Sequence, residues 1–165
     1  LLAPRLGHHY RQEPTLLMKT IIRKMREDDL LDVLIVGREF SRAAPKSHKW
    51  DQDKTVEFLN NCLASPQYEV FVTETDGEVT GGIVCALTLM LMSHTKVATE
   101  LVWFVSKEAR GKPSSIKLVK TFESWAKENG AQYVIMGDIK HVGELGNLYE
   151  RMGYHAVETA YMKEI

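Results

Sequence analysis

A short polar segment after an apolar stretch has the residue types and spacing of a phosphate site. Residues 101–105 are apolar on both faces, which predicts a buried strand. A polar turn follows, and helical periodicity begins at Pro113, a favoured first position of a helix. Strand, tight turn and helix N-terminus together direct backbone N–H groups and the positive end of a helix dipole at one point. An ordinary strand-to-helix connection produces the same pattern, so both interpretations stay open.

The elements around this segment predict an α+β fold with a mixed sheet. Apolar periodicity predicts four helices, and β-branched or alternating runs predict six strands. Asp76-Gly77 between two such runs indicates a hairpin, and Gly81-Gly82 indicates a bulge in its second strand. Hairpins precede the strand–helix units, so we expect an antiparallel front and a parallel back. The expected helices are 30–40, 51–64, 114–129 and 143–151, and the expected strands are 20–24, 68–75, 78–92, 101–105, 132–136 and 155–163.

Composition excludes several classes of protein. The 165 residues are 44% hydrophobic and 26% charged, which is typical of one globular domain. A net charge of −1 gives no bulk electrostatic attraction to nucleic acid, and no apolar run is long enough to span a bilayer. Cys62 and Cys85 have no paired spacing, so we expect two buried free thiols and a location in the cytoplasm. We interpret residues 1–17 as a leader or extension and 18–165 as the domain.

Three motifs resemble a known family. They are the hairpin VTETDGEVTGGIV, the strand and turn LVWFVSKEARGKPSSIKLV, and NLYERMGY at residues 147–154. With the order of elements, they resemble the GNAT superfamily of acyl-CoA-dependent N-acyltransferases over nearly all of residues 18–165. The resemblance implies a single mixed α+β domain with four helices. It also implies that the parallel strands at 101–105 and 132–136 splay apart.

The resemblance also implies an enzyme. The expected activity is transfer of an acetyl group from acetyl-CoA, the co-substrate, to a primary amine within a ternary complex. The acceptor is an amine of a small molecule or a protein, and no metal, nucleic acid or membrane is implied. A homodimer is a further expectation from the family alone.

Two residues are implied as the acid and base of this reaction. Tyr149 lies at the family's Tyr position, where its hydroxyl would protonate the leaving thiolate. Glu100, beside the apolar strand, is expected to have a raised pKa and to take the amine's proton. A core tyrosine and a solvated strand-end charge are the alternative interpretations of these two. His48 and His141 are the next candidates for the base, although each is also typical of an exposed loop histidine.

The resemblance assigns coenzyme binding to the strand and the turn. The backbone of Phe104 and Val105 is expected to pair with the pantetheine arm, and an N–H near Val105 to polarise the thioester carbonyl. Trp103 points to the face opposite Phe104 and is interpreted as a core residue. The turn residues expected to face the phosphates are Lys107, Arg110, Gly111, Lys112, Pro113, Ser114 and Ser115.

Two other hypotheses stay open, one from departures from the family pattern and one because the turn could hold another phosphate. Pro113 and Ser115 replace the two small residues of the phosphate turn, and Val142 replaces an Asn. Proline lacks an N–H, so one hypothesis is a catalytically degenerate relative acting as a CoA-binding or regulatory module. Another is a binder of a different nucleotide phosphate. The acceptor side would be formed by Glu39, Arg42, His48, Trp50 and Asp51, whose mixed charges select no substrate.

Overall fold

Five strands form one sheet in the computed structural model, which describes residues 19–44, 49–139 and 145–165. The predicted leader 1–17 and the candidates His48, His141 and Val142 lie outside the described residues. The strands are β1 (Thr20–Lys24), β2 (Tyr68–Thr75), β3 (Glu78–Leu89), β4 (Lys96–Val105) and β5 (Tyr133–Ile135). The α-helices are α1 (Leu30–Ala43), α2 (Gln52–Ala64), α3 (Pro113–Glu128) and α4 (Gly146–Arg151), with 3-10 turns η1 (Glu27–Asp29) and η2 (Lys107–Ala109).

The sheet is mixed, as the sequence predicts. Its order is β1-β2-β3-β4-β5, and the first three pairings are antiparallel. Asp76 and Gly77, with φ angles of 51° and 91°, form the predicted hairpin turn between β2 and β3. The pairing of β4 with β5 is parallel. The predicted antiparallel front and parallel back are therefore confirmed.

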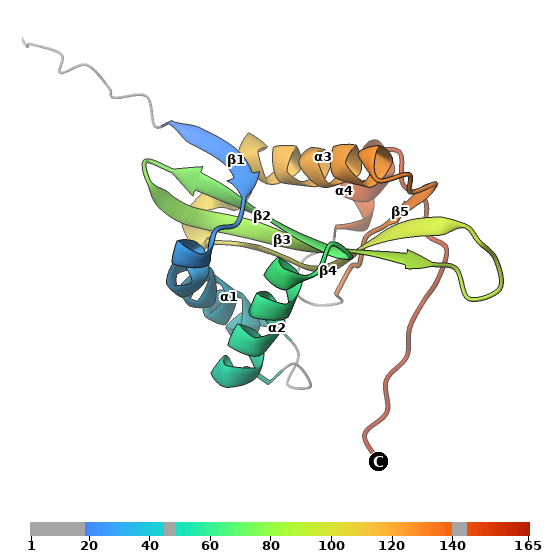
Figure 1. The fold of residues 1–165 in the computed structure, drawn as a ribbon, viewed down its shortest axis with the longest axis horizontal. Coiled ribbons are helices and arrows are strands. Elements are labelled where there is room, and N and C mark those ends of the chain that lie inside the picture. The colour runs from blue at the N-terminus through green and yellow to red at the C-terminus, as the bar shows by residue number, and fades with distance from the viewer. Residues whose placement is uncertain (1–18, 45–48, 140–144) are drawn as a thin grey trace, which may run out of the picture.

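Helices cover both faces of the sheet (Figure 1). Helices α1 and α2 pack on one face, around Val70, Val84 and Phe104. Helix α3 packs on the other face, around Ile83 and Cys85. Cys62 belongs to the first core and Cys85 to the second. Both thiols are buried and free, as expected, and the sheet separates them.

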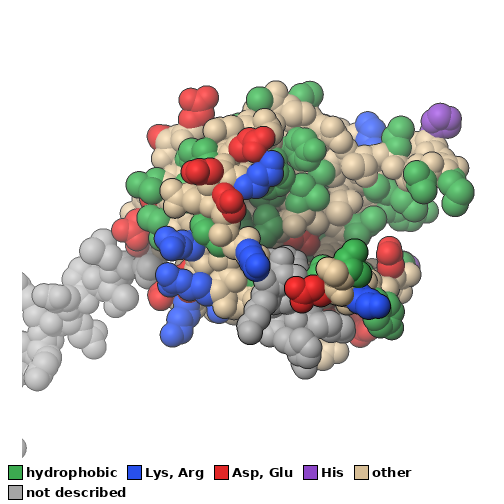
Figure 2. Space-filling view, turned by 90° about the horizontal axis from the view of Figure 1, so that it is seen from below, with side chains coloured by type: hydrophobic (Ala, Val, Ile, Leu, Met, Phe, Trp, Pro, Cys, Tyr) green, Lys and Arg blue, Asp and Glu red, His purple; other side chains and the backbone are tan. Residues whose placement is uncertain are grey.

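The β3–β4 hairpin projects beyond the sheet, and its end is apolar. Figure 2 shows these hydrophobic side chains gathered at the right of the view. Strand β3 ends at Leu89 and not at the predicted Met92. Leu91 and Met92, in the turn that follows, are 97% and 94% exposed. None of the helices in the described ranges is long and apolar enough to cross a membrane.

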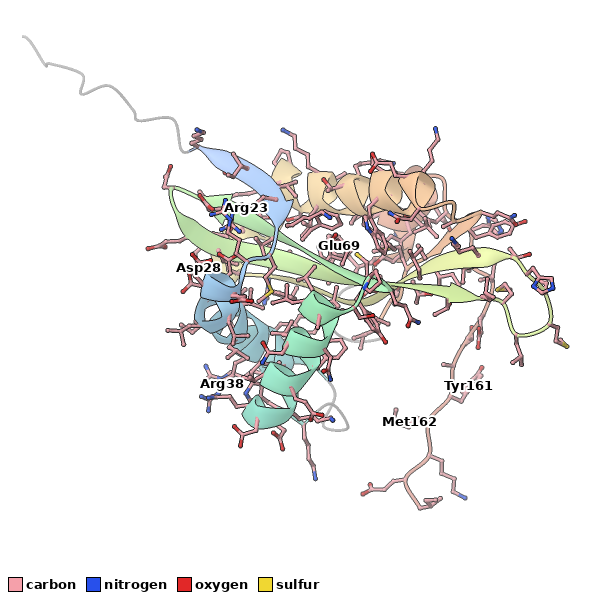
Figure 3. The ribbon with its side chains drawn as sticks, in the orientation of Figure 1. Arg23, Asp28, Arg38, Glu69, Tyr161 and Met162 are labelled. Atoms are coloured by element: carbon pink, nitrogen blue, oxygen red, sulfur yellow. The ribbon has the colours of Figure 1, made fainter. Side chains whose placement is uncertain are left out.

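The predicted last strand, 155–163, is wrong. No strand forms after α4, and the segment leads away from the sheet with Tyr161 and Met162 pointing outwards (Figure 3). Val157 and Tyr161 are 75% and 94% exposed. A strand needs a neighbour for its backbone N–H and C=O groups, and none of the described strands pairs with this segment.

Candidate active site

Strands β4 and β5 separate after a short stretch of pairing. Their parallel register covers only Val97–Thr99 against Tyr133–Ile135. From Glu100 to Val105, β4 pairs with β3 alone, so its other edge is open. This is the splay that the family resemblance implies. Such an edge presents unpaired backbone groups to an extended ligand.

A bulge lies where the two strands separate. Val84 pairs with Val102 and Cys85 pairs with Glu100, so Leu101 is an additional residue in β4. Leu101 is 44% exposed. The bulge changes the direction of the β4 side chains after Leu101 relative to those before it. The apolar sequence here gave no signal for it.

Phe104 and Val105 are the last two residues of β4 and belong to its half that pairs with β3 alone. The ring of Phe104 is buried over Gly82, where a Cβ atom would lie 2.5 Å from the ring's Cζ atom. This explains the second glycine of the Gly81-Gly82 pair, because any side chain would clash there. The predicted bulge is also present, since Thr80 is an unpaired extra residue opposite β2. Trp103 packs on the opposite face, as expected.

Part of the turn after β4 uses its amides in local hydrogen bonds. The N–H of Lys112 donates to the Ala109 carbonyl at 3.3 Å, and that of Ser115 donates to the Lys112 carbonyl at 3.1 Å. The Ser115 hydroxyl also donates to the Ala109 carbonyl, at 3.3 Å. Gly111, with φ of 74°, makes no backbone hydrogen bond within the described chain. The N–H groups of Gly111 and Ser114 are therefore donors in this part of the described chain that stay open to an anion.

Two of the turn's three cations are open to solvent without an ion pair in the described residues. Lys107 and Lys112 are exposed, and neither takes part in a salt bridge there. Arg110 behaves differently, because its Nε atom donates to the Val105 carbonyl at 3.3 Å. Its Nη2 atom lies 3.9 Å from Oε1 of Glu39. Pro113 begins α3 as predicted, and Ser114 follows in the first turn.

Glu100 and Tyr149 meet at one residue that sequence reasoning missed. The N–H of Gly137 donates to Oε2 of Glu100 at 2.9 Å. The Tyr149 hydroxyl donates to the carbonyl of the same Gly137, also at 2.9 Å. Gly137 follows β5, at the mouth of the splay. The two candidates for acid and base therefore belong to one cluster, although 49 positions separate them in the chain.

Burial changes the protonation of this cluster. Burial raises the pKa of Glu100, and the N–H groups of Gly137 and Trp103 partly oppose that change. Burial also raises the pKa of Tyr149, with further contributions from the charges of Glu100 and Asp138. Tyr149 therefore keeps its proton, as a general acid must. Glu100 binds a proton more readily than an exposed carboxylate.

Three of the residues expected on the acceptor side have separate contacts in the described structure. Asp51 caps α2 by accepting from the N–H of Lys54 at 2.9 Å. Trp50 packs against the core beside Gly37. Glu39 reaches the turn after β4, where its Oε1 accepts from the N–H of Lys107 at 3.2 Å. The sequence alone contained no signal for this last contact.

One groove in the described structure does not coincide with the cluster. It has a volume of about 570 Å³ and lies between β1 and α3. Strand β1 is at the opposite edge of the sheet from β5. Lys112, Pro113 and Ser114 also line this groove, so it meets the turn but not Glu100 or Tyr149.

Solved structures share this fold. The aminoglycoside N-acetyltransferase AAC(6')-Iy in complex with CoA has a TM-score of 0.75 at 14% identity, covering 99% of each chain. A transcriptional regulator from Bacillus halodurans has a TM-score of 0.74 at 19% identity, covering 89% of this chain and 100% of its own. A ribosomal-protein-alanine N-acetyltransferase from Brucella melitensis has a TM-score of 0.71 at 16% identity, covering 89% and 99%.

The sequence itself identifies the family. No curated protein matches the chain. Residues 35–154, however, match the family described as Acetyltransferase (GNAT) family. This range includes both candidate catalytic residues, the open half of β4 and the turn that follows it. The chain therefore belongs to the GNAT family of acetyltransferases.

Proposed function

We propose that the protein transfers the acetyl group of acetyl-CoA to a primary amine, with both substrates bound together. The observation that carries the proposal is the cluster at the splay, where Glu100 and Tyr149 meet at Gly137. Beside the open strand edge, a carboxylate with a raised pKa can accept a proton and a protonated tyrosine can donate one.

The chain offers positions that fit both ends of acetyl-CoA. The open edge of β4 from Leu101 to Val105 suits the amide-containing pantetheine arm. The turn at the start of α3, with the free N–H of Gly111 and the charges of Lys107 and Lys112, suits its phosphates. When bound, acetyl-CoA supplies the reactive thioester.

Each residue of the cluster then has one task. Glu100 takes a proton from the amine, directly or through water, so that the nitrogen lone pair can attack the thioester carbonyl carbon. A backbone N–H near Val105 stabilises the negative charge that develops on the carbonyl oxygen. As the carbon–sulfur bond breaks, Tyr149 gives its proton to the departing sulfur. The Tyr149 hydroxyl must turn away from the Gly137 carbonyl to do so, which this hydrogen bond of 2.9 Å permits at modest cost.

The acceptor is a primary amine of a small molecule or of a protein. The two acetyltransferases among the structures described above are named for an aminoglycoside and for a ribosomal protein's alanine. Both classes therefore belong in the first screen. The chain's own residues favour neither class.

The test combines binding with turnover. Calorimetric titration with acetyl-CoA is expected to give saturable binding at micromolar concentrations, about −8 kcal/mol. In Tyr149→Phe we expect turnover to fall about 100-fold with acetyl-CoA affinity preserved, because only the proton donor is lost. An unchanged turnover in this variant would remove Tyr149 from the mechanism.

Tyr154→Phe is the matched control. Tyr154 lies beside Tyr149, with ring centroids 5.7 Å apart, but its hydroxyl donates to Glu123 at 2.8 Å. The same chemical change therefore leaves the Gly137 cluster intact. We expect turnover within about threefold of the wild type, a range typical of a change outside the reaction centre.

A second candidate function is a CoA-binding module without turnover. Pro113 supplies no N–H, and the amides of Lys112 and Ser115 are used within the turn. The neighbour from Bacillus halodurans is named a transcriptional regulator and has the same fold. Binding of acetyl-CoA without acetylation of any amine in the screen would favour this function.

A further inference from the structure

Glu39 joins two parts of the fold that are distant in the sequence. It lies near the end of α1, and its side chain reaches the turn after β4, 68 residues further along the chain. Its Oε1 accepts a hydrogen bond from the N–H of Lys107 at 3.2 Å. The same oxygen lies 3.9 Å from Nη2 of Arg110. One carboxylate therefore contacts both the backbone and a cation of the turn.

The guanidinium of Arg110 lies against the end of β4, beside Glu39. Its Nε atom donates to the Val105 carbonyl at 3.3 Å, so the side chain folds back over the end of β4. Arg110 is exposed, and its partners at this position are a neutral carbonyl and a carboxylate at the limit of ion-pair distance. Such contacts are weak, and a doubly charged anion would compete with them effectively.

We propose that Glu39 is a positioning residue for the turn that binds the coenzyme. Through the N–H of Lys107 it fixes the start of the turn, and through its charge it keeps Arg110 folded back until an anionic ligand replaces it. The proposal rests on the proposed function, because the anion is the diphosphate of acetyl-CoA.

The two contacts have opposite effects on coenzyme affinity. The hydrogen bond to Lys107 orders the turn before binding, which lowers the entropy lost on association. The charge opposes binding, since it competes for Arg110 and repels the diphosphate. Replacing the carboxylate with an amide removes the second effect and retains the first.

Two substitutions of Glu39 separate these effects. In Glu39→Gln, we expect the dissociation constant for CoA to fall about threefold, because the acceptor for the Lys107 N–H is kept and the competing charge is lost. In Glu39→Ala, we expect affinity to be at least threefold weaker than in Glu39→Gln, because the turn is no longer fixed. Calorimetry with CoA measures both values. Amide hydrogen exchange at Lys107 should accelerate in Glu39→Ala and stay near the wild-type rate in Glu39→Gln.

Glu108→Gln and Asp32→Asn are the controls. Glu108 is an exposed acid within the turn itself, and Asp32 is an exposed acid on α1; neither makes a salt bridge in the described chain. A Glu108→Gln variant that tightens CoA binding as much as Glu39→Gln would show a general charge effect and overturn the proposal. An unchanged affinity and Lys107 exchange rate in both Glu39 variants would also overturn it.

The test distinguishes this inference from the proposed function. A wild-type protein that does not bind CoA at all would overturn the proposed function and, with it, the role of Glu39 in binding. A wild-type protein that binds CoA with Glu39 variants of equal affinity would overturn the role of Glu39 alone.

Discussion

Asp29 and Glu100 are both at least partly buried, but their carboxylates have different partners. Asp29 accepts two hydrogen bonds from the guanidinium of Arg23, at 2.6 and 2.8 Å, and one from the N–H of Arg26 at 2.7 Å. Glu100 accepts from the N–H of Gly137 and forms no salt bridge with any described residue. One carboxylate faces a cation, and the other faces backbone dipoles and an aromatic cluster.

Their pKa values move in opposite directions as a result. Hydrogen bonds from Arg23 lower the pKa of Asp29, whereas burial raises that of Glu100. Asp29 therefore stabilises the fold above its ordinary pKa of 3.8, and this contribution is lost as the pH falls below it. Glu100 has the opposite effect, because the folded protein retains its proton longer than the unfolded chain does. Stability falls as the pH rises above its ordinary value of 4.5.

The contrast distinguishes a carboxylate that stabilises the fold, Asp29, from one that is suited to proton transfer, Glu100. A paired carboxylate is fixed in one protonation state and contributes to stability. An unpaired one costs stability when it is charged, and for that reason it accepts a proton readily. Glu100 is placed at the open edge of β4, where such a group is useful, and Asp29 is placed beside β1, at the far side of the sheet.

Asp29→Asn should give the largest loss of stability. It leaves the partly buried Arg23 with Glu74 as its remaining acidic partner, so we expect unfolding to become easier by about 3 kcal/mol. Urea denaturation at neutral pH measures this, and acetyl-CoA affinity should be unchanged. The control is Asp28→Asn, since Asp28 is exposed and adjacent, and it should change stability by less than about 0.5 kcal/mol. Equal effects of the two variants would contradict the structural role.

Glu100→Gln should separate stability from activity. The amide oxygen can still accept from the N–H of Gly137, so we expect stability at pH 7 to be unchanged or slightly higher. The decline in stability above pH 4.5 should disappear. Turnover should fall about 100-fold, because the base is lost.

The exposed strand residue Glu78 provides the control for Glu100. Glu78→Gln removes the same charge from the same sheet and should keep the wild-type pH profile of both stability and turnover. A Glu100→Gln variant with the wild-type pH–rate profile would exclude Glu100 as the base, whatever its effect on stability.

Local patterns were sufficient for most of the fold. The Asp76-Gly77 hairpin, the strand before the turn and the start of α3 at Pro113 each depend on neighbouring residues, and all are present. The strand expected at 155–163 depends instead on a partner elsewhere in the sheet. No periodicity encodes that partner, and the structure provides none among the described strands.

For the candidate site, the sequence could suggest residues but not their contacts. Glu100 and Tyr149 could be named, yet Gly137 could not, because a backbone group has no residue-type signal. The turn residues could be named as well, but not which of their amides are free, since Lys112 and Ser115 use theirs in local hydrogen bonds. The contact of Glu39 with the turn could not be predicted either, because it joins residues 68 positions apart in the chain.

Pro113→Ala should have the smallest of these effects. It tests the turn after β4, whereas Asp29→Asn and Glu100→Gln test the two carboxylates. The alanine restores an N–H at the first position of α3, beside the free N–H of Gly111. One added hydrogen bond to a phosphate should tighten CoA binding about fivefold, near 1 kcal/mol. Pro66→Ala, at an exposed turn before β2, removes a proline without adding an amide to the site and should leave affinity unchanged.

If Pro113→Ala binds no more tightly, the first amide of α3 does not face the phosphates. Binding would then depend on Lys107, Arg110 and Lys112, and the dissociation constant should rise steeply with salt, as exposed charge pairs require.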